Sequence, residues 1–311
     1  MKIGEKLREE PMARRTSSGL LHLSEGPIDL LIKAKGEACA VERAEDAARL
    51  RFEGLLGELV AELGWLRRPL GKTPPPLQGP IARRMAEAAW PYRDAFVTPM
   101  VAVAGAVAEA VLCAMVQAAP LRRAFVNNGG DIALHLTASE HLDIGVIRAP
   151  EAFAMAELAR PEAFVRIDAK SPVRGIATSG RHGRSFSLGI ADAVTVLART
   201  AAGADAAATM IANAVDLDDP AIRRRPACEL DPDSDLGEIS VVVDVGALDE
   251  MKIAAALRRG RERAEALIER GLIEGALLSL HGRWESVGAQ AKDALALART
   301  EDRPRQVSSN P

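Results

Sequence analysis

Aromatic residues are scarce in this sequence, because tryptophan, tyrosine and phenylalanine together make up 3% of its 311 residues. Alanine recurs instead, in runs such as AVAGAVAEAVLCAMVQAA and TAAGADAAATMIANAV. A hydrophobic content of 48% is enough to bury a substantial core. We therefore expect a globular protein whose core depends on the close approach of small-faced helices.

Cysteine is also rare. Cys39, Cys113 and Cys228 are odd in number, far apart and without C-x-x-C spacing, which argues against a disulfide framework or a zinc site. The first residues, MKIGEKLREEPMARRTSSG, lack the apolar core of a secretory signal. These features predict a cytoplasmic protein.

An excess of positive charge is missing too. The formal net charge is -3, from 40 basic and 43 acidic residues, so nucleic acid is not expected as a partner. Met100–Ala119 approaches the roughly 20 apolar residues of a spanning helix. Because Glu109 and Gln117 would lie inside the span, we interpret it as a buried helix and expect no membrane contact. Homo-oligomer formation remains open.

The order of expected elements predicts the α+β class with mainly antiparallel sheet and long helices. We expect residues 1–18 to be disordered, 19–288 to form a single domain and 289–311 to be a flexible tail. An alanine-rich helix next to a glycine-bearing strand turn occurs twice, which suggests two pseudo-repeated halves around a central cleft. The main expected elements are helices at 42–66, 100–117, 203–215 and 251–271, and strands at 123–126, 132–136, 141–147, 191–198 and from 238.

The first motif that could carry chemistry is FVNNGGDIALHL, where Asn128, Gly129, Gly130 and Asp131 interrupt a strand pattern. Asn and Gly tolerate positive φ angles and form tight hairpins, which explains the motif without a ligand. Alternatively, glycine lets a ligand approach the main chain and Asp131 offers a carboxylate to it. The local sequence leaves both interpretations open.

A second motif, GIATSGRHGRSFSLGI, contains the turn Thr178, Ser179 and Gly180. Its backbone N–H groups could hold a phosphate or carbonyl oxygen, although an ordinary strand-ending turn has the same composition. His182 follows the turn and is a candidate general base, while a lone surface histidine is the commoner case.

A third motif is GADAAATMIANAV, in which Asp205 and Thr209 stand four residues apart. On a helix they share one face, where a carboxylate and a hydroxyl could bind one hard cation such as Mg²⁺. The other interpretation is an acidic residue near a helix N-terminus, favoured by the helix dipole.

These three motifs, together and in this order, resemble the ApbE superfamily, whose best-known members are magnesium-dependent FAD:protein FMN transferases. The family's counterparts are a glycine at a helix start, GGD, TSG and ADALAT. Here they correspond to Val103-Ala104-Gly105, Gly129-Gly130-Asp131, Thr178-Ser179-Gly180 and Ala204–Thr209. The segments VNNGGDIAL and FSLGIADAVTVLA are similar to the sequences of an uncharacterised ApbE-like branch of this superfamily.

The resemblance implies a T-fold-like architecture and a magnesium site at Asp205, Thr209 and the Ala104 carbonyl. It also implies that Asn128–Asp131 and Thr178–Gly180 line a cleft for FAD or a flavin-like nucleotide. In the transferases, a hydroxyl of an acceptor protein attacks the FAD pyrophosphate while Mg²⁺ neutralises charge on the phosphoryl oxygens.

The sequence departs from the transferases between the TSG turn and the next strand. Their His-Ile-Ile-Asp-Pro-x-x-Gly segment, whose histidine is implicated in transfer, is replaced by RHGRSFSLGI. The lysine of the family's Ala-Lys-Gly is absent as well. We therefore expect a protein that binds a flavin or nucleotide-like ligand with Mg²⁺, with FMN transfer left open. The alternative is a non-catalytic accessory protein of a metabolic or cofactor pathway.

Overall fold

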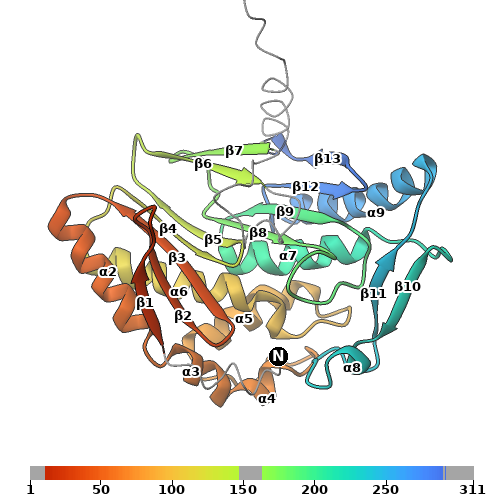
Figure 1. Ribbon diagram of the computed structural model, residues 1–311, viewed down its shortest axis with the longest axis horizontal. Helices are drawn as coiled ribbons and strands as arrows, with labels where there is room; N and C mark the ends of the chain where they lie inside the picture. Colours follow the sequence, from red (N-terminus) through yellow and green to blue (C-terminus); the bar gives the residue numbers. More distant parts are fainter. Residues whose placement is uncertain (1–10, 147–162, 290, 292–311) are drawn as a thin grey trace, which may run out of the picture.

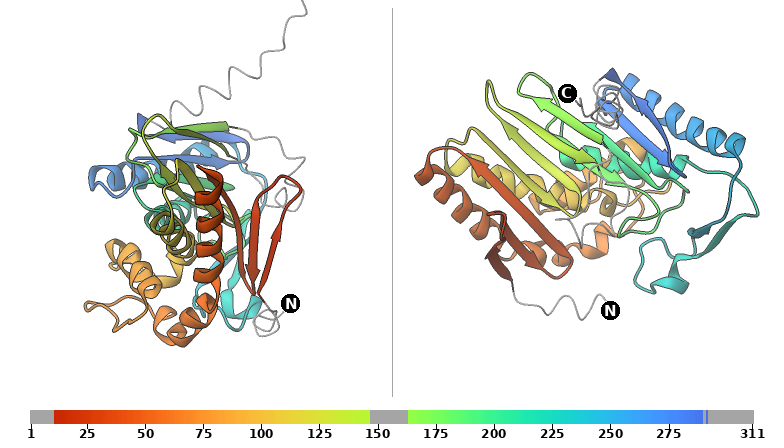
Figure 2. Two further views of the ribbon diagram at one scale, coloured as in Figure 1. Left: turned by 90° about the vertical axis from the view of Figure 1, so that its left-hand side faces the viewer. Right: turned by 45° about the horizontal axis from the view of Figure 1, so that its top comes forward.

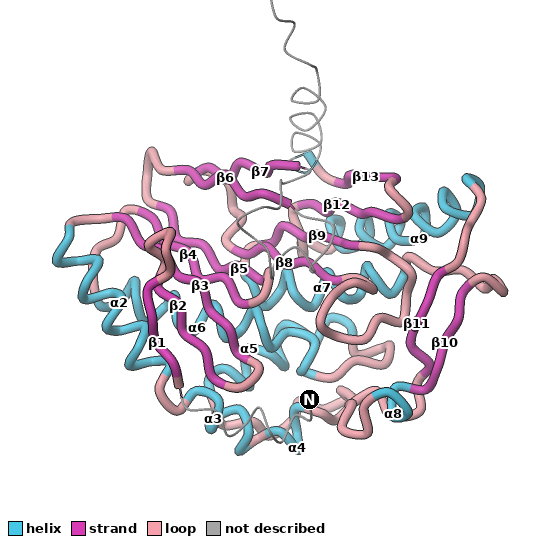
Figure 3. Tube along the Cα trace, viewed as in Figure 1, coloured by secondary structure: helices cyan, strands magenta, loops and turns pink. Residues whose placement is uncertain are grey.

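A large antiparallel sheet forms the centre of the protein, in a computed structural model that describes residues 11–146, 163–289 and 291 (Figures 1 and 3). Its strand order is β1-β2-β3-β4-β5-β8-β9-β12-β13, and every neighbouring pair runs antiparallel. The predicted α+β class with mainly antiparallel sheet is therefore confirmed. The strands span Met12–Arg15 (β1), Leu21–Glu25 (β2), Ile28–Lys35 (β3), Arg123–Asn128 (β4), Asp131–Leu136 (β5), Gly175–Ser179 (β8), Ala193–Ala198 (β9), Gly275–Leu280 (β12) and Arg283–Val287 (β13).

Two small hairpin sheets complete the strand content. They pair β6 (His141–Val146) with β7 (Ala163–Asp168), and β10 (Ile222–Pro226) with β11 (Ser240–Val245). The helices are α2 (Ala38–Phe52), α3 (Leu55–Ala61), α4 (Leu63–Leu66), α5 (Pro80–Ala89), α6 (Val103–Ala118), α7 (Ala201–Ala214), α8 (Ala227–Leu230) and α9 (Glu250–Glu269), with short 3-10 helices at Trp90–Tyr92 (η1) and Pro99–Ala102 (η2).

The long helices cover one face of the sheet, as the two views of Figure 2 show. Helix α6 contacts β4 and β5, α7 contacts β8 and β9, and α9 contacts β12 and β13. Alternate residues of β9 divide between the two faces: Val194 and Val196 join the helix-side core, while Leu197 joins a second core on the opposite face. That second core also contains Val165 and Ile167 of β7, so both faces of the central strands are covered.

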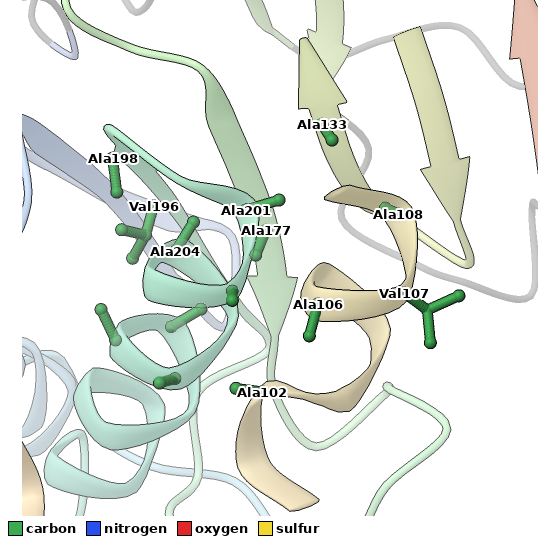
Figure 4. Close-up of a cluster of buried hydrophobic side chains, with 14 of the residues drawn as sticks. Ala102, Ala106, Val107, Ala108, Ala133, Ala177, Val196, Ala198, Ala201 and Ala204 are labelled. Atoms are coloured by element: carbon green, nitrogen blue, oxygen red, sulfur yellow. The ribbon is translucent and has the colours of Figure 1, made fainter. Parts of the chain in front are cut away.

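Helices α6 and α7 approach each other closely where both begin, through the alanines drawn in Figure 4. A Cβ atom added to Gly105 would lie 2.3 Å from the Ala201 carbonyl oxygen. Side chains of each helix bind the other helix's first turn: Asp205 accepts from the Gly105 N–H at 3.0 Å, and Glu109 accepts from the Ala202 N–H at 3.0 Å. The two helix N-termini therefore satisfy each other's free N–H groups.

Each half of the large sheet shows the same sequence of hairpin, helices and hairpin, first in β2–β5 and then in β8, β9, β12 and β13. The internal duplication stays a prediction, as does the single domain at 19–288. The expected tail at 289–311 lies outside the described residues except for 289 and 291.

Two expectations are wrong in detail. The helix expected at 42–66 is divided, because α2 ends at Phe52 and Gly54 adopts a left-handed φ of 72° before α3 begins. The segment 1–18 was expected to be disordered, but Met12–Arg15 forms strand β1 and pairs with β2. All four of its residues are exposed, so the sequence has no alternation of buried apolar residues that would predict this strand.

In the described part of the chain, one helical stretch, Pro99–Ala118, has the length and composition to cross a membrane. It comprises η2 and α6, and 56% of its most apolar window is buried inside the protein. Contacts with α2, α7, β4 and β5 cover it, as expected for a core helix.

The contact at Gly105 leads to a stability prediction. In Gly105→Ala the new methyl group meets backbone atoms that cannot rotate away, so we expect the free energy of unfolding to fall by about 1–3 kcal/mol. Thermal unfolding monitored by circular dichroism measures this as a loss of several degrees in Tm. Gly57→Ala in α3 is the matched control, because nothing lies within 4 Å of its added Cβ. An equal Tm for both variants would contradict the close-contact account.

Candidate functional site

A pocket of about 710 Å³ lies where the first turns of α6, the β4–β5 turn, the end of β8 and one face of α7 meet. Helices α3 and α4 supply one of its walls, and residues 231–236 line it as well. All ten residues that the sequence proposed for cofactor and metal binding line this pocket: Ala104, Asn128, Gly129, Gly130, Asp131, Thr178, Ser179, Gly180, Asp205 and Thr209. The structure thus brings together motifs that are up to 100 positions apart.

Helix α7 positions Asp205 and Thr209 one turn apart on the face towards the pocket. The helix starts at Thr200, whose side chain accepts a hydrogen bond from the Gly203 N–H at 3.1 Å. The Asp205 Oδ2 atom is engaged by Gly105, and the Thr209 hydroxyl donates to Ser179 Oγ at 3.3 Å. Asp205 and Thr209 thus line the pocket while backbone and side-chain hydrogen bonds hold them in place.

The β4–β5 turn is fixed by asparagine side chains. Asn127 accepts from the Gly130 N–H at 2.8 Å, as in an ordinary hairpin turn. Asn128 is buried, with 4% exposure, and its Nδ2 atom donates to the Ala104 carbonyl oxygen at 3.2 Å. This bond ties the turn to the start of α6, where Ala104 lines the pocket. The segment thus forms the expected hairpin turn and also lines the pocket, while its contact with a ligand stays a prediction.

Asp131 opens strand β5 and reaches across to the end of β8. Its Oδ1 atom accepts from the Thr178 N–H at 3.3 Å. The Thr178 hydroxyl forms a 2.9 Å hydrogen bond with the Thr195 hydroxyl on β9. Because strands β5, β8 and β9 are neighbours in the sheet, this register fixes the carboxylate of Asp131 relative to the TSG turn.

Two carboxylates are therefore confined in one pocket. Burial raises the pKa of Asp205 to about 7, against hydrogen bonds from the Gly105 and Ala104 backbone that favour the charged form. Burial also raises the pKa of Asp131 well above its usual range, and repulsion from Asp205 raises it further. The Thr178 N–H and the Arg184 guanidinium oppose this rise.

The polar end of the pocket offers oxygen atoms for a hard cation: the Asp205 carboxylate, the Thr209 hydroxyl and the Ala104 carbonyl. Such a set suits Mg²⁺, which prefers oxygen ligands and retains several waters. Within the described ranges, no group of three or more His, Cys, Asp or Glu side chains is arranged to hold a metal ion. A cation here would therefore depend on hydroxyl, carbonyl, water or ligand oxygens as well as carboxylates.

His182, the candidate general base, does not line the pocket. Its Nε2 atom lies 3.5 Å from Asp192 Oδ1. Asp192 is buried and is already bound by the Arg181 guanidinium and by the His281 N–H, at 2.7 and 2.6 Å. His182 thus belongs to an ion-pair cluster at the base of the β8–β9 loop.

Sequence reasoning missed the apolar wall and one cation. Leu56, Leu59 and Leu63 line the pocket from α3 and α4, where one continuous helix was expected. Arg184 lines it from the β8–β9 loop, and nothing in the sequence connects this arginine with Gly129. Gly54, inside the helix expected at 42–66, is the one sequence signal that could have predicted the division of this helix and hence the apolar wall.

An acidic loop forms another part of the pocket lining, through Asp231, Asp233 and Asp235. Asp235 accepts a hydrogen bond from the Thr98 hydroxyl at 2.5 Å. Because Thr98 directly precedes η2, this bond holds the acidic loop against the start of that helix. Asp233 donates its backbone N–H to Asp231 Oδ1 at 3.0 Å. The lining therefore has more acidic than basic side chains.

Comparisons with curated proteins identify relatives of uncharacterised type. The chain is 35% identical over 204 residues to a UPF0280 protein of Methanothrix thermoacetophila, covering 62% of this chain and 74% of that protein. It is 35% identical over 187 residues to a UPF0280 protein of Methanopyrus kandleri, covering 58% of this chain and 70% of that protein.

Among solved structures, the chain resembles the apo flavinyl transferase ApbE of Pseudomonas stutzeri, with a TM-score of 0.43 and 11% identity over 91% of this chain and 95% of the other. It also resembles the flavin transferase ApbE of Vibrio cholerae, with a TM-score of 0.33 and 12% identity over 92% and 99%. TM-scores this low establish neither a shared ligand nor a shared activity.

A family model described as "AbpE bacteria" matches residues 12–286. This range includes every one of the three sequence motifs and all of the pocket residues named above. The ApbE resemblance expected from the motifs is thus confirmed, and the chain belongs to the AbpE family of bacteria.

Proposed function

We propose that this protein binds a flavin or a flavin nucleotide together with Mg²⁺ in the pocket between α6, α7 and the β4–β5 turn. The observation that carries the proposal is the convergence of all ten motif residues on one pocket. Its volume of about 710 Å³ lies in the range of ordinary small-molecule sites. Nothing in a tight hairpin or a capped helix alone requires these motifs to share a cavity.

The division of the pocket into an apolar and a polar part supports a ligand with a ring system and a charged group. Leucines of α3 and α4, with Phe96 and Val97, form an apolar wall that suits a planar ring. Phe96 and Phe186 are 38% and 37% exposed although they are large apolar side chains. A bound ring would cover such surface and stabilise the complex by removing it from water.

The polar part supports Mg²⁺. Asp205, Thr209 and the Ala104 carbonyl would hold the ion, and Asp131 lies close enough to Asp205 for their charges to repel. A bound Mg²⁺ supplies positive charge that neutralises phosphoryl oxygens of a nucleotide. It would also relieve the repulsion between the two buried carboxylates, which in the metal-free protein opposes their ionisation.

The alternative, a ligand-binding accessory protein without transfer activity, is supported by a specific observation. In the part of the chain that the structure describes, no histidine, lysine or cysteine lines the pocket, and His182 is paired with Asp192. FMN transfer would then rely on a carboxylate as the base. Release of AMP from FAD in the presence of a hydroxyl-bearing acceptor protein separates the two functions, because only a transferase produces it.

We also propose that the protein works in the cytoplasm. Its three cysteines are free, and Cys39 and Cys113 are exposed to solvent. Exposed thiols without partners are compatible with a reducing compartment.

Calorimetric titration with FMN and FAD tests the proposed function. We expect binding that strengthens on addition of Mg²⁺, and in Asp205→Asn we expect this Mg²⁺-dependent gain to fall at least tenfold, since the cation loses a charged ligand. The amide oxygen of the substituted side chain can still accept from the Gly105 N–H, so the fold is retained. Asp46→Asn is the control, because Asp46 is an exposed residue of α2 outside the pocket. Absence of flavin binding at millimolar concentration would refute the proposal.

The pH dependence of Mg²⁺ binding is the second test. Because Mg²⁺ binds the ionised carboxylate, protons compete with it wherever the pH lies below the raised pKa of Asp205, about 7 in the metal-free protein. We expect the apparent affinity to be constant at pH 8 and above, and to fall roughly tenfold per pH unit below 7 when one proton is displaced. Titration of Mg²⁺ at fixed FMN between pH 5.5 and 8.5 measures this. An affinity that is unchanged down to pH 5.5 would show that Asp205 is not a ligand.

A further inference from the structure

Arg184 is a cation in an acid-lined pocket, and its charge acts on the nearby carboxylate of Asp131. Among the described residues, no hydrogen bond or ion pair engages its guanidinium, whereas Arg181 of the same loop is bound to Asp192. Arg184 lines the pocket together with its neighbours Gly183 and Ser185. Because no described residue accepts a hydrogen bond from this guanidinium, its N–H donors are available for a ligand.

The β8–β9 loop holds Arg184 in place from both ends. At its start, Arg181 binds Asp192 through two nitrogens at 2.9 and 2.7 Å, and its N–H donates to the Ala191 carbonyl at 2.9 Å. At its end, the buried Ser187 hydroxyl donates to the Gly189 carbonyl at 2.9 Å. These hydrogen bonds therefore fix the loop on each side of Arg184.

Gly129 leaves room for the guanidinium. A Cβ atom at Gly129 would lie 2.2 Å from the Arg184 Nη2 atom, so the arginine rests directly on the backbone of the β4–β5 turn. The same glycine has a left-handed φ of 64°. Any larger residue at this position would both strain the turn and displace the guanidinium. The GGD motif thus has a use beyond the turn itself, because it makes room for a cation beside Asp131.

The charges around the pocket indicate what Arg184 binds. Among the residues that the structure describes, two arginines line the pocket, Arg67 and Arg184, against six aspartates, namely Asp131, Asp192, Asp205, Asp231, Asp233 and Asp235. An anionic ligand would be repelled unless fixed cations faced it. A planar guanidinium matches the oxygens of a phosphoryl group in a two-point contact. Mg²⁺ in proteins is commonly held by one or two carboxylates together with ligand phosphates.

We infer that Arg184 is the anion-binding residue of this pocket and holds a phosphoryl group of the ligand against the Gly129–Gly130 turn. This inference rests on the proposed function, since it assigns the ligand of the same pocket to the phosphorylated flavins or nucleotides. Arg184 lies in the β8–β9 loop and lines the pocket beside Gly180. The side chain at this edge of the pocket therefore binds anions and does not exchange protons.

The test compares FMN with riboflavin, which differ only by the phosphate group, in the presence of Mg²⁺. In Arg184→Gln we expect FMN affinity to fall about 10- to 100-fold, the usual range for a lost charge-assisted hydrogen-bond pair, while riboflavin affinity changes less than about twofold. Arg184→Lys should retain part of the FMN affinity. Arg83→Gln is the matched control, because it removes the same charge from an exposed position of α5 outside the pocket, and we expect less than about a twofold loss.

Equal losses for FMN and riboflavin, or no loss for either, would overturn the inference. Titration with inorganic pyrophosphate and Mg²⁺ separates it from the flavin proposal. If the unmodified protein binds pyrophosphate but neither flavin, and Arg184→Gln abolishes that binding, the anion site stands and the flavin function fails. If the unmodified protein binds flavins equally well with and without phosphate, the function stands and the anion site fails. Binding of neither probe rejects both.

Discussion

The contact between the first turns of α6 and α7 is the constraint on which the rest of the structure depends. Gly105 permits it, because no side chain separates its backbone from the Ala201 carbonyl. The two helices then cap each other, with Asp205 on the Gly105 N–H and Glu109 on the Ala202 N–H. Arg84 of α5 in turn lies 3.0 Å from Glu109 and adds a third helix to the arrangement. The small residues at this contact fit the geometry, since large side chains there would hold the two helices apart.

The same contact places the polar end of the pocket. Asp205 is held at the start of α6 and lines the pocket together with the β4–β5 turn. Asn128 closes that side by binding the Ala104 carbonyl, and Asp131 reaches the end of β8 from the same turn. Burial then makes two neighbouring carboxylates difficult to ionise together, which is the electrostatic condition that a bound cation relieves. Fold and proposed chemistry thus share one set of interactions.

The sequence was informative where local chemistry decides the outcome. Asparagine and glycine in NNGGD form the expected hairpin turn, and the alanine-rich segments form the expected helices. The Thr-Ser-Gly segment differs, because Thr178 and Ser179 are the last residues of strand β8 and only Gly180 follows it. Their convergence followed from the family resemblance rather than from spacing, because a pocket is a property of tertiary contacts. The antiparallel class was predictable from consecutive strands divided by long helices, and the sheet confirms it.

Other features could not be predicted, for physical reasons. The helical periodicity of 42–66 continues through Gly54, so nothing but the glycine indicated that the chain turns and presents Leu56 and Leu59 to the pocket. Strand β1 is charged and exposed, and it is defined only by its pairing with β2. The Arg184 guanidinium lies directly against Gly129, a residue of a different hairpin. His182 has a side chain that can act as a base, but it lies against Asp192 instead of lining the pocket.

Anomalous diffraction from crystals grown with FMN and Mn²⁺, used in place of Mg²⁺, tests the central claim most directly. The account predicts one manganese peak within bonding distance of the Asp205 carboxylate and the Thr209 hydroxyl, with the flavin ring against the apolar wall of α3 and α4. A manganese peak elsewhere, or a flavin bound outside the pocket, would contradict it.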